Sequence, residues 1–201
     1  MDERSQLQLA ADRHARRLAV FQLADADIAL VRELRPFAEQ RLPALLQQWH
    51  SRFAAWPEIQ NALTNPAVHA VRVDHWTRAV SGWIDGDFIE SAKRLARTFY
   101  DNGVPGYAVA ICHSTVINGI IGELGLETGR GGLGVILGAA ATARKMALRT
   151  VLTKLAWLDL ELLLETYAEA EQESRTKALR EMAETVEREA RQAVERVALH
   201  T

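Results

Sequence analysis

The chain has 201 residues, 48% of them hydrophobic and 25% charged, which is the composition of a globular protein that can bury one sizeable core. Its formal net charge of −2 gives no general attraction to nucleic acid or to an anionic membrane surface. The single cysteine, Cys112, cannot form an internal disulfide, the first residues lack the order of a signal peptide, and no apolar run is long enough to span a bilayer. We expect a cytoplasmic protein that neither inserts into a membrane nor binds nucleic acid.

Apolar residues recur at helical spacing along most of the chain, and the five prolines fall where one helix can give way to the next. After an N-terminal helical extension over residues 1–20, the pattern predicts helices over 28–34, 42–55, a short segment after Pro57, 66–84, 88–102, 105–124 and 135–167. Gly103 is expected to end the helix before it in a left-handed conformation, and the glycine-rich residues 125–134 are expected to contain a turn. No alternating strand pattern is found, so the predicted fold class is all-α.

Residues 169–198 differ in kind, since Glu, Arg and Ala dominate them and a thin apolar stripe continues. The stripe advances in steps of three and four, at Leu179, Met182, Val186, Ala190, Ala193 and Val197. A helix with so narrow a stripe is marginally stable alone in water, so we expect a coiled coil, most simply with a second copy of the chain. The pattern runs to the end of the sequence, and residues 169–201 are interpreted as a linker towards a further, signalling domain.

A resemblance to a known family rests on four segments in chain order, residues 27–36, 49–58, 81–104 and 158–167. They resemble the sensor globins, which are haem-binding domains fused to chemoreceptor or cyclase outputs. Residues 184–190 resemble the coiled helix that leads from such sensors into a methyl-accepting domain, and a diguanylate cyclase output is also compatible.

The resemblance implies a globin fold over residues 21–168 and a homodimer through the last two globin helices and the coiled coil. It also implies that haem b senses oxygen, another gas or a redox change, within a receptor of the methyl-accepting chemotaxis type. Two positions depart from the family. The histidine that holds the iron is replaced by Phe99, whose ring has no lone pair to give, and the distal tyrosine is replaced by His50.

His113 and His50 are therefore the candidate iron ligands. His113 lies in the most apolar predicted helix, where it either replaces the missing axial ligand or is a core histidine hydrogen-bonded to a neighbouring helix. His50 either binds the iron or an iron-bound gas, or is a hydrogen-bonded histidine that lines an empty globin pocket. The cofactor-binding residues we predict are His113, His50, Trp49, Phe99, Trp76 and Val109.

Other polar residues carry weaker signals. His75 is expected to be solvated or salt-bridged, because Asp74 and Arg78 are near it in sequence. A zinc site is disfavoured, since the histidines are widely spaced and the side chains of Cys112 and His113 diverge on a helix.

Enzyme signatures are absent. The glycine run at 129–134 lacks the Gly-Lys-Ser/Thr of a phosphate loop, and no acid is in view for the Ser114–Thr115 pair. The sequence is therefore compatible with two functions. One is a haem-based sensor with unusual ligation. The other is a haem-free globin that serves as a sensor or dimerisation module and binds another small molecule or a partner.

Overall fold

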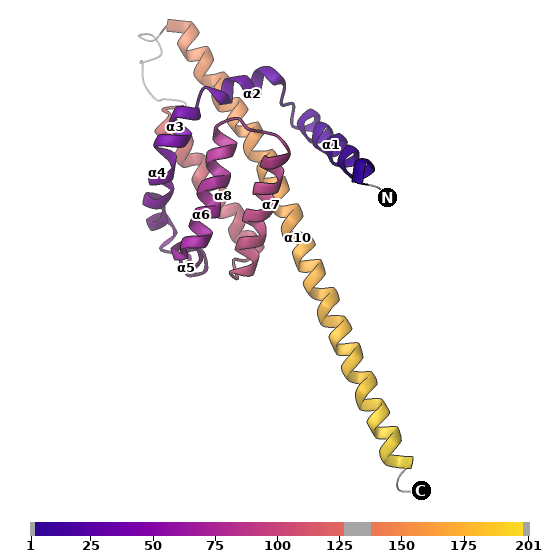
Figure 1. The fold of residues 1–201 in the computed structure, drawn as a ribbon. Helices are drawn as coiled ribbons and strands as arrows, with labels where there is room; N and C mark the ends of the chain where they lie inside the picture. Colours follow the sequence, from indigo (N-terminus) through magenta and orange to yellow (C-terminus); the bar gives the residue numbers. More distant parts are fainter. Residues whose placement is uncertain (1–2, 127–137, 199–201) are drawn as a thin grey trace.

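The structure, a computed structural model, describes residues 3–126 and 138–198, and every regular element in those ranges is a helix (Figure 1). The helices are α1 (Glu3–Val20), α2 (Asp25–Arg32), α3 (Arg35–Gln40), α4 (Leu42–Gln48), the 3-10 helix η1 (Trp49–Phe53), α5 (Pro57–Thr64), α6 (Pro66–Val80), α7 (Gly86–Asp101), α8 (Gly106–Glu123) and α10 (Gly138–Ala198). The all-α prediction is confirmed.

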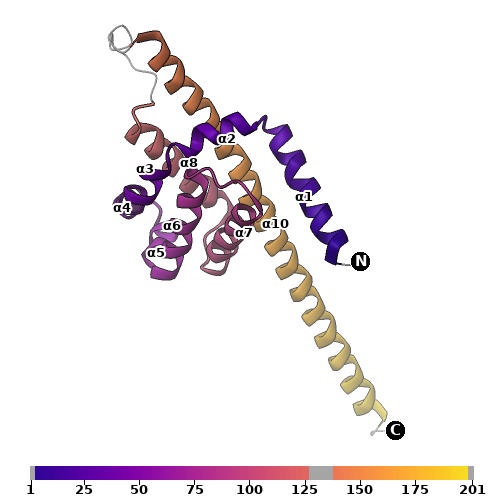
Figure 2. The ribbon, with the colours of Figure 1, turned by 45° about the horizontal axis from the view of Figure 1, so that its top comes forward.

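The helices from α3 to α8 pack on one side of α10, and α1 lies along the other side (Figures 1 and 2). Helix α10 is one continuous element of 61 residues, which closes the bundle and then continues well beyond it as a single rod. From Gly138 on, the predicted helix over 135–167 and the predicted coiled-coil tail are therefore parts of one helix, and residues 135–137 lie outside the described residues. Of the predicted turn at 125–134, the structure describes only residues 125 and 126. Gly125 has φ +60°.

Two adjoining groups of buried apolar side chains form the core, and α10 contributes to both. One group joins α5, α7 and α8 to Val151, Leu155, Leu158 and Leu162 of α10. The other joins α3, α4, α6 and α8 to Leu152. Because these positions recur at helical spacing, one face of α10 is buried against the bundle from 151 to 170.

The ends of the central helices follow the sequence signals. Asp85 caps α7 by accepting from the Phe88 amide at 3.1 Å, and Asn65 caps α6 by accepting from the Ala67 amide at 3.0 Å. Gly103 follows α7 with φ +74°, a conformation that glycine adopts without strain. The expected left-handed stop is confirmed.

The segment 42–55 differs from the single helix expected there. Helix α4 ends at Gln48, and the chain tightens into η1. Carbonyls at the end of an α-helix need partners, and the Leu46 carbonyl accepts from the Arg72 guanidinium of α6 at 3.2 Å. Trp49 at the start of η1 packs on Gly119 of α8, where an added Cβ would lie 2.6 Å from the indole ring.

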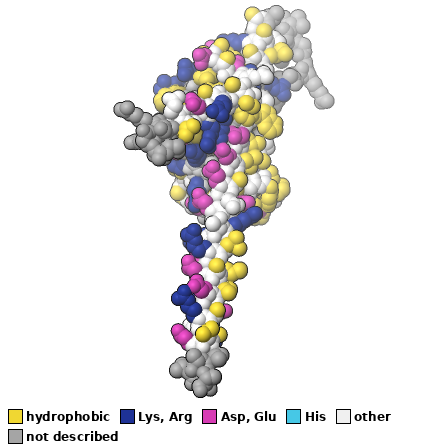
Figure 3. Space-filling model, turned by 90° about the vertical axis from the view of Figure 1, so that its right-hand side faces the viewer, with side chains coloured by type: hydrophobic (Ala, Val, Ile, Leu, Met, Phe, Trp, Pro, Cys, Tyr) yellow, Lys and Arg dark blue, Asp and Glu magenta, His cyan; other side chains and the backbone are white. Residues whose placement is uncertain are grey.

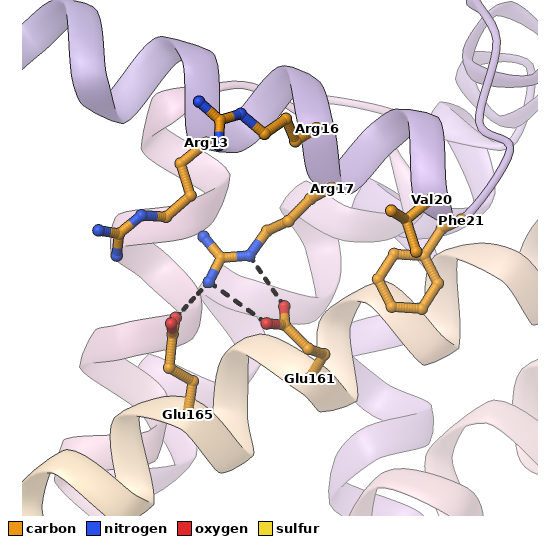
Figure 4. A pocket seen from close by; sticks show the side chains of 7 residues that line it. All are labelled: Arg13, Arg16, Arg17, Val20, Phe21, Glu161 and Glu165. Carbon is orange, nitrogen blue, oxygen red and sulfur yellow. Dashed lines mark hydrogen bonds and ion pairs between the residues drawn. The ribbon is translucent and has the colours of Figure 1, made fainter.

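Helix α1 is attached to α10 by ion pairs. The Arg17 guanidinium donates to both carboxylate oxygens of Glu161, at 2.9 and 3.3 Å, and also to Glu165 (Figure 4). The aromatic ring of Phe21 lies beside them and completes a shallow surface pocket. No helix of the described residues is long and apolar enough to cross a membrane.

Candidate functional site

Five of the six predicted cofactor residues are buried and His50 is partly exposed, and they have different neighbours. Phe99 of α7 and Val109 of α8 are buried in the first apolar group, together with Cys112. Trp49 and Trp76 are buried in the second group. Phe99 thus acts as a core side chain, as its ring chemistry requires.

His113 of α8 is bound to a carboxylate. Its Nε2 lies 3.1 Å from Oδ2 of Asp159, which projects from the buried face of α10. Its ring is 5.2 Å from the Trp76 ring, centroid to centroid. Of the two interpretations left open for His113, the structure shows the hydrogen bond to a neighbouring helix.

His75 of α6 approaches the same carboxylate from the other side. Its Nε2 lies 2.9 Å from Asp159 Oδ1, an ion-pair contact whose direction departs from that of a straight hydrogen bond. Its Nδ1 lies 2.9 Å from the Ser91 hydroxyl of α7. That hydroxyl donates its one proton to the Phe88 carbonyl at 2.7 Å, so it accepts from His75 Nδ1. With Nδ1 donating to Ser91 and Nε2 beside Asp159, the His75 ring bridges the hydroxyl of α7 and the carboxylate of α10.

Of the two roles expected for His75, solvation is wrong, and the salt bridge is present, but with Asp159 and not with the sequence neighbours Asp74 and Arg78. The side chain is 0% exposed, and its ring stacks on Phe88 with centroids 5.6 Å apart. The physical reason is Asp159, which is itself 1% exposed and supplies the charge that makes burial of an imidazole tolerable.

Asp159 holds four helices together. Burial alone would raise its pKa, but the charge of His75 and the hydrogen bond from His113 hold the pKa of this carboxyl below its usual range. The group of Asp159, His75, His113 and Ser91, called here the aspartate network, joins α6, α7 and α8 to α10. Sequence reasoning missed Asp159, although a lone carboxylate on the apolar face formed by Leu152, Leu155 and Leu162 was a usable signal.

His50 lies in a different environment, between η1 and α6. Its ring stands perpendicular to that of His69, with centroids 5.1 Å apart. Burial, and then the nearby Arg72 and His69, lower the pKa of His50 to about 4. No interaction joins His50 to His113 within the described part of the chain, and each imidazole has its own set of partners.

This arrangement does not fit a haem held by His50 and His113. The His113 Nε2 is occupied by a carboxylate, and Phe99 has no donor atom. The His75–Ser91 hydrogen bond and the stacking of His75 on Phe88 hold α6 directly against α7, beside the residues that were expected to line the pocket. No three His, Cys, Asp or Glu side chains of the described residues are placed to hold a metal ion.

Comparisons with known proteins agree with this architecture. The Protoglobin family model matches residues 10–173. A solved structure, the globin domain of a Geobacter sulfurreducens globin-coupled sensor, is similar with a TM-score of 0.61 and 15% sequence identity. The alignment covers 76% of this chain and 96% of that chain, and at this identity it shows the shared fold alone. No curated protein sequence matches significantly. The globin fold expected from the sequence is confirmed, and the chain belongs to the Protoglobin family.

Proposed function

We propose that this chain is the sensor domain of a cytoplasmic signalling protein and that its globin core works without a haem. The observation that carries the proposal is the double role of α10. The same helix holds Asp159 at the centre of the core and extends as an exposed rod to residue 198. A change in the core that moves Asp159 therefore moves the helix that leads out of it.

The aspartate network supplies the mechanical link. Its three buried polar contacts to Asp159 and Ser91 come from α6 and α8, so a ligand that shifts either helix alters the partners of the carboxylate. Buried polar contacts of this kind have discrete arrangements, because a half-satisfied network is costly. A switch between two such arrangements would rotate or shift α10.

Apolar side chains that α10 leaves uncovered support the proposal of a homodimer. Trp157 is 60% exposed, and it lines a surface groove with Leu160 of α10 and Ile117 and Ile121 of α8. Within the described ranges these are the last two helices of the globin bundle, which the resemblance implies as the interface. Burying this surface against a second copy would remove apolar area from water.

The extension of α10 offers a second dimer surface. Hydrophobic side chains run along one side of the rod and charged side chains along the other (Figure 3). The predicted stripe is exposed at Leu179, Met182, Val186, Ala190 and Ala193, and Val197 lies outside the residues whose side chains are described. A parallel coiled coil would cover this stripe and lead into an output domain, either methyl-accepting or cyclase.

The dimer is tested by sedimentation equilibrium. Met182→Glu places a charge in the stripe, and we expect it to weaken self-association at least tenfold. Ala183→Glu introduces the same side chain on a neighbouring face of the helix and should leave association unchanged. Equal association constants for both variants would contradict the coiled coil.

A haem-based gas or redox sensor is the second candidate function. It is favoured by His50, whose Nε2 is buried without a hydrogen-bond partner at the family's distal position. The visible spectrum of the chain expressed with haem supply separates the candidates. We expect a folded, colourless protein. A stoichiometric Soret band that shifts in His50→Ala or His113→Ala would establish the haem sensor instead.

A further inference from the structure

Arg72 of α6 is a buried cation without a counter-charge. Its side chain is 1% exposed, and one guanidinium nitrogen, Nη1, donates to the Leu46 carbonyl at 3.2 Å. The other, Nη2, is buried and has no hydrogen-bond partner. Among the described residues no carboxylate forms an ion pair with it. Burying a charge in this way is costly unless something neutralises it.

Two imidazoles lie beside the guanidinium. His69 is one helical turn before Arg72 on the same face of α6, and His50 reaches it from η1. His50 Nε2 and His69 Nδ1 are also buried and also lack hydrogen-bond partners. Three unpartnered nitrogens therefore gather in one place, where buried polar groups normally find partners. We call His50, His69 and Arg72 the arginine cluster.

The chemistry of the arginine cluster selects its ligand. A guanidinium donates and never accepts, and it repels metal cations, so the missing group is an acceptor with negative charge. Cys112 does not supply that charge, since burial raises the pKa of its thiol to about 12 in spite of the nearby Arg72. Burial lowers the pKa of Arg72 to about 10, which still leaves it cationic at neutral pH.

We propose that Arg72, His50 and His69 form a binding site for a small monovalent anion, either a halide or the carboxylate of a small organic acid. One positive charge matches one negative charge, and the two imidazoles offer further N–H donors to the same ligand. His50 and His69 are partly exposed although their unpartnered nitrogens are buried, so the site lies just below the surface between η1 and α6. The site goes beyond the proposed function, because anion binding here needs neither a dimer nor an output domain.

A purely structural role for Arg72 predicts a different response of the arginine cluster to anions. As a simple cap of α4, Arg72 would need a single hydrogen bond to the Leu46 carbonyl, and ordered water would complete the rest. Water would then satisfy the cluster equally well at any anion concentration. The two roles therefore differ in whether the histidine rings respond to anions.

Nuclear magnetic resonance of the imidazole rings in the full chain makes this test. Bromide, formate and acetate are titrated separately into the protein in a buffer of large zwitterions. We expect saturable shifts of the His50 and His69 ring signals with one dissociation constant. Saturation by bromide alone assigns a halide, and saturation by formate or acetate assigns a carboxylate.

Variants complete the test. Arg72→Met should weaken binding at least tenfold, and Arg78→Met, which removes the same charge further along α6, should leave it unchanged. If Arg72→Met does not fold, Arg72→Lys and His69→Gln are milder substitutions. Arg72→Lys should weaken anion binding several-fold, because it removes the guanidinium geometry. Shifts that stay linear with every anion, or that are the same in these variants and in the wild type, would overturn the proposal.

Discussion

The aspartate network and the arginine cluster are built from the same parts with opposite charges. Each places two histidines around one buried ionisable group. The first has a carboxylate, Asp159, which both of its imidazoles contact, so its polar groups have their partners within the protein. The second has a guanidinium, Arg72, and an imidazole cannot neutralise it. The sign of one buried charge therefore decides the role of the histidine pair beside it. A carboxylate makes the pair part of the core, and a guanidinium leaves it free to bind an anion.

The largest effect is expected from removing the carboxylate. Asp159→Asn leaves His75 and His113 buried without the carboxylate that both of them contact, and we expect a loss of about 3–5 kcal/mol in the free energy of unfolding. Urea denaturation measures it. Asp74→Asn, which breaks an exposed ion pair with Arg94, is the control and should cost less than about 1 kcal/mol. Similar losses in both variants would show that the network does not stabilise the fold.

Displacing η1 should perturb the arginine cluster without removing a polar group. Gly119→Ala puts a methyl group 2.6 Å from the Trp49 ring, and overpacking of this kind typically costs about 1–3 kcal/mol. Gly106→Ala is the matched control, because its methyl group would meet Tyr167 at 3.5 Å, an ordinary contact. Thermal unfolding should separate the two variants. An unchanged unfolding midpoint in Gly119→Ala would mean that η1 can shift away from α8 without a cost in stability.

His50 of the arginine cluster should make the free energy of unfolding depend on pH. The pKa of His50 is lowered from 6.5 to about 4, so between these values the unfolded chain binds a proton that the folded chain does not. Stability is therefore complete above pH 6.5 and falls as the pH drops towards 4. After solvent screening at this partly exposed site we expect a loss on the order of 1 kcal/mol.

Two comparisons check the pH effect. His50→Gln should remove this part of the slope in unfolding experiments at constant ionic strength. A saturating anion should reduce it in the wild type, because the anion favours the charged ring. An identical slope in His50→Gln would rule out His50 as its source.

The smallest effect is expected from removing the unpaired cation. In buffer without small anions, Arg72→Met loses the hydrogen bond to the Leu46 carbonyl and also loses the cost of a buried charge. These changes oppose each other, so we expect a net change of about 1 kcal/mol or less. Chemical denaturation with and without bromide would measure it. A loss as large as that of Asp159→Asn would show that Arg72 already has its counter-charge.

Much of the fold could be predicted from sequence because it depends on local signals. Periodic apolar residues and prolines indicate the central helices, and Gly103 indicates the end of α7. The change from α4 to η1 could not be predicted, since it depends on Arg72 and Gly119, which are distant in sequence.

The site was harder to predict for the same reason. The sequence shows Phe99 at the position of the family's iron ligand, but it does not show that the carboxylate partner of His75 and His113 lies on α10. A histidine pattern alone does not show whether a carboxylate or a guanidinium faces the rings. Asp159 on the apolar face of α10 and Arg72 within α6 were the residues to weigh.

The link between the core and α10 can be measured most directly by electron–electron distance measurements on a spin-labelled form of the proposed homodimer. A nitroxide on Glu184→Cys, in a Cys112→Ala background, reports the separation of the two α10 extensions. We predict that Asp159→Asn changes this distance distribution, while Asp74→Asn leaves it as in the parent protein. Identical distributions in folded dimers of all three proteins would contradict the claim that Asp159 couples the globin core to its output helix.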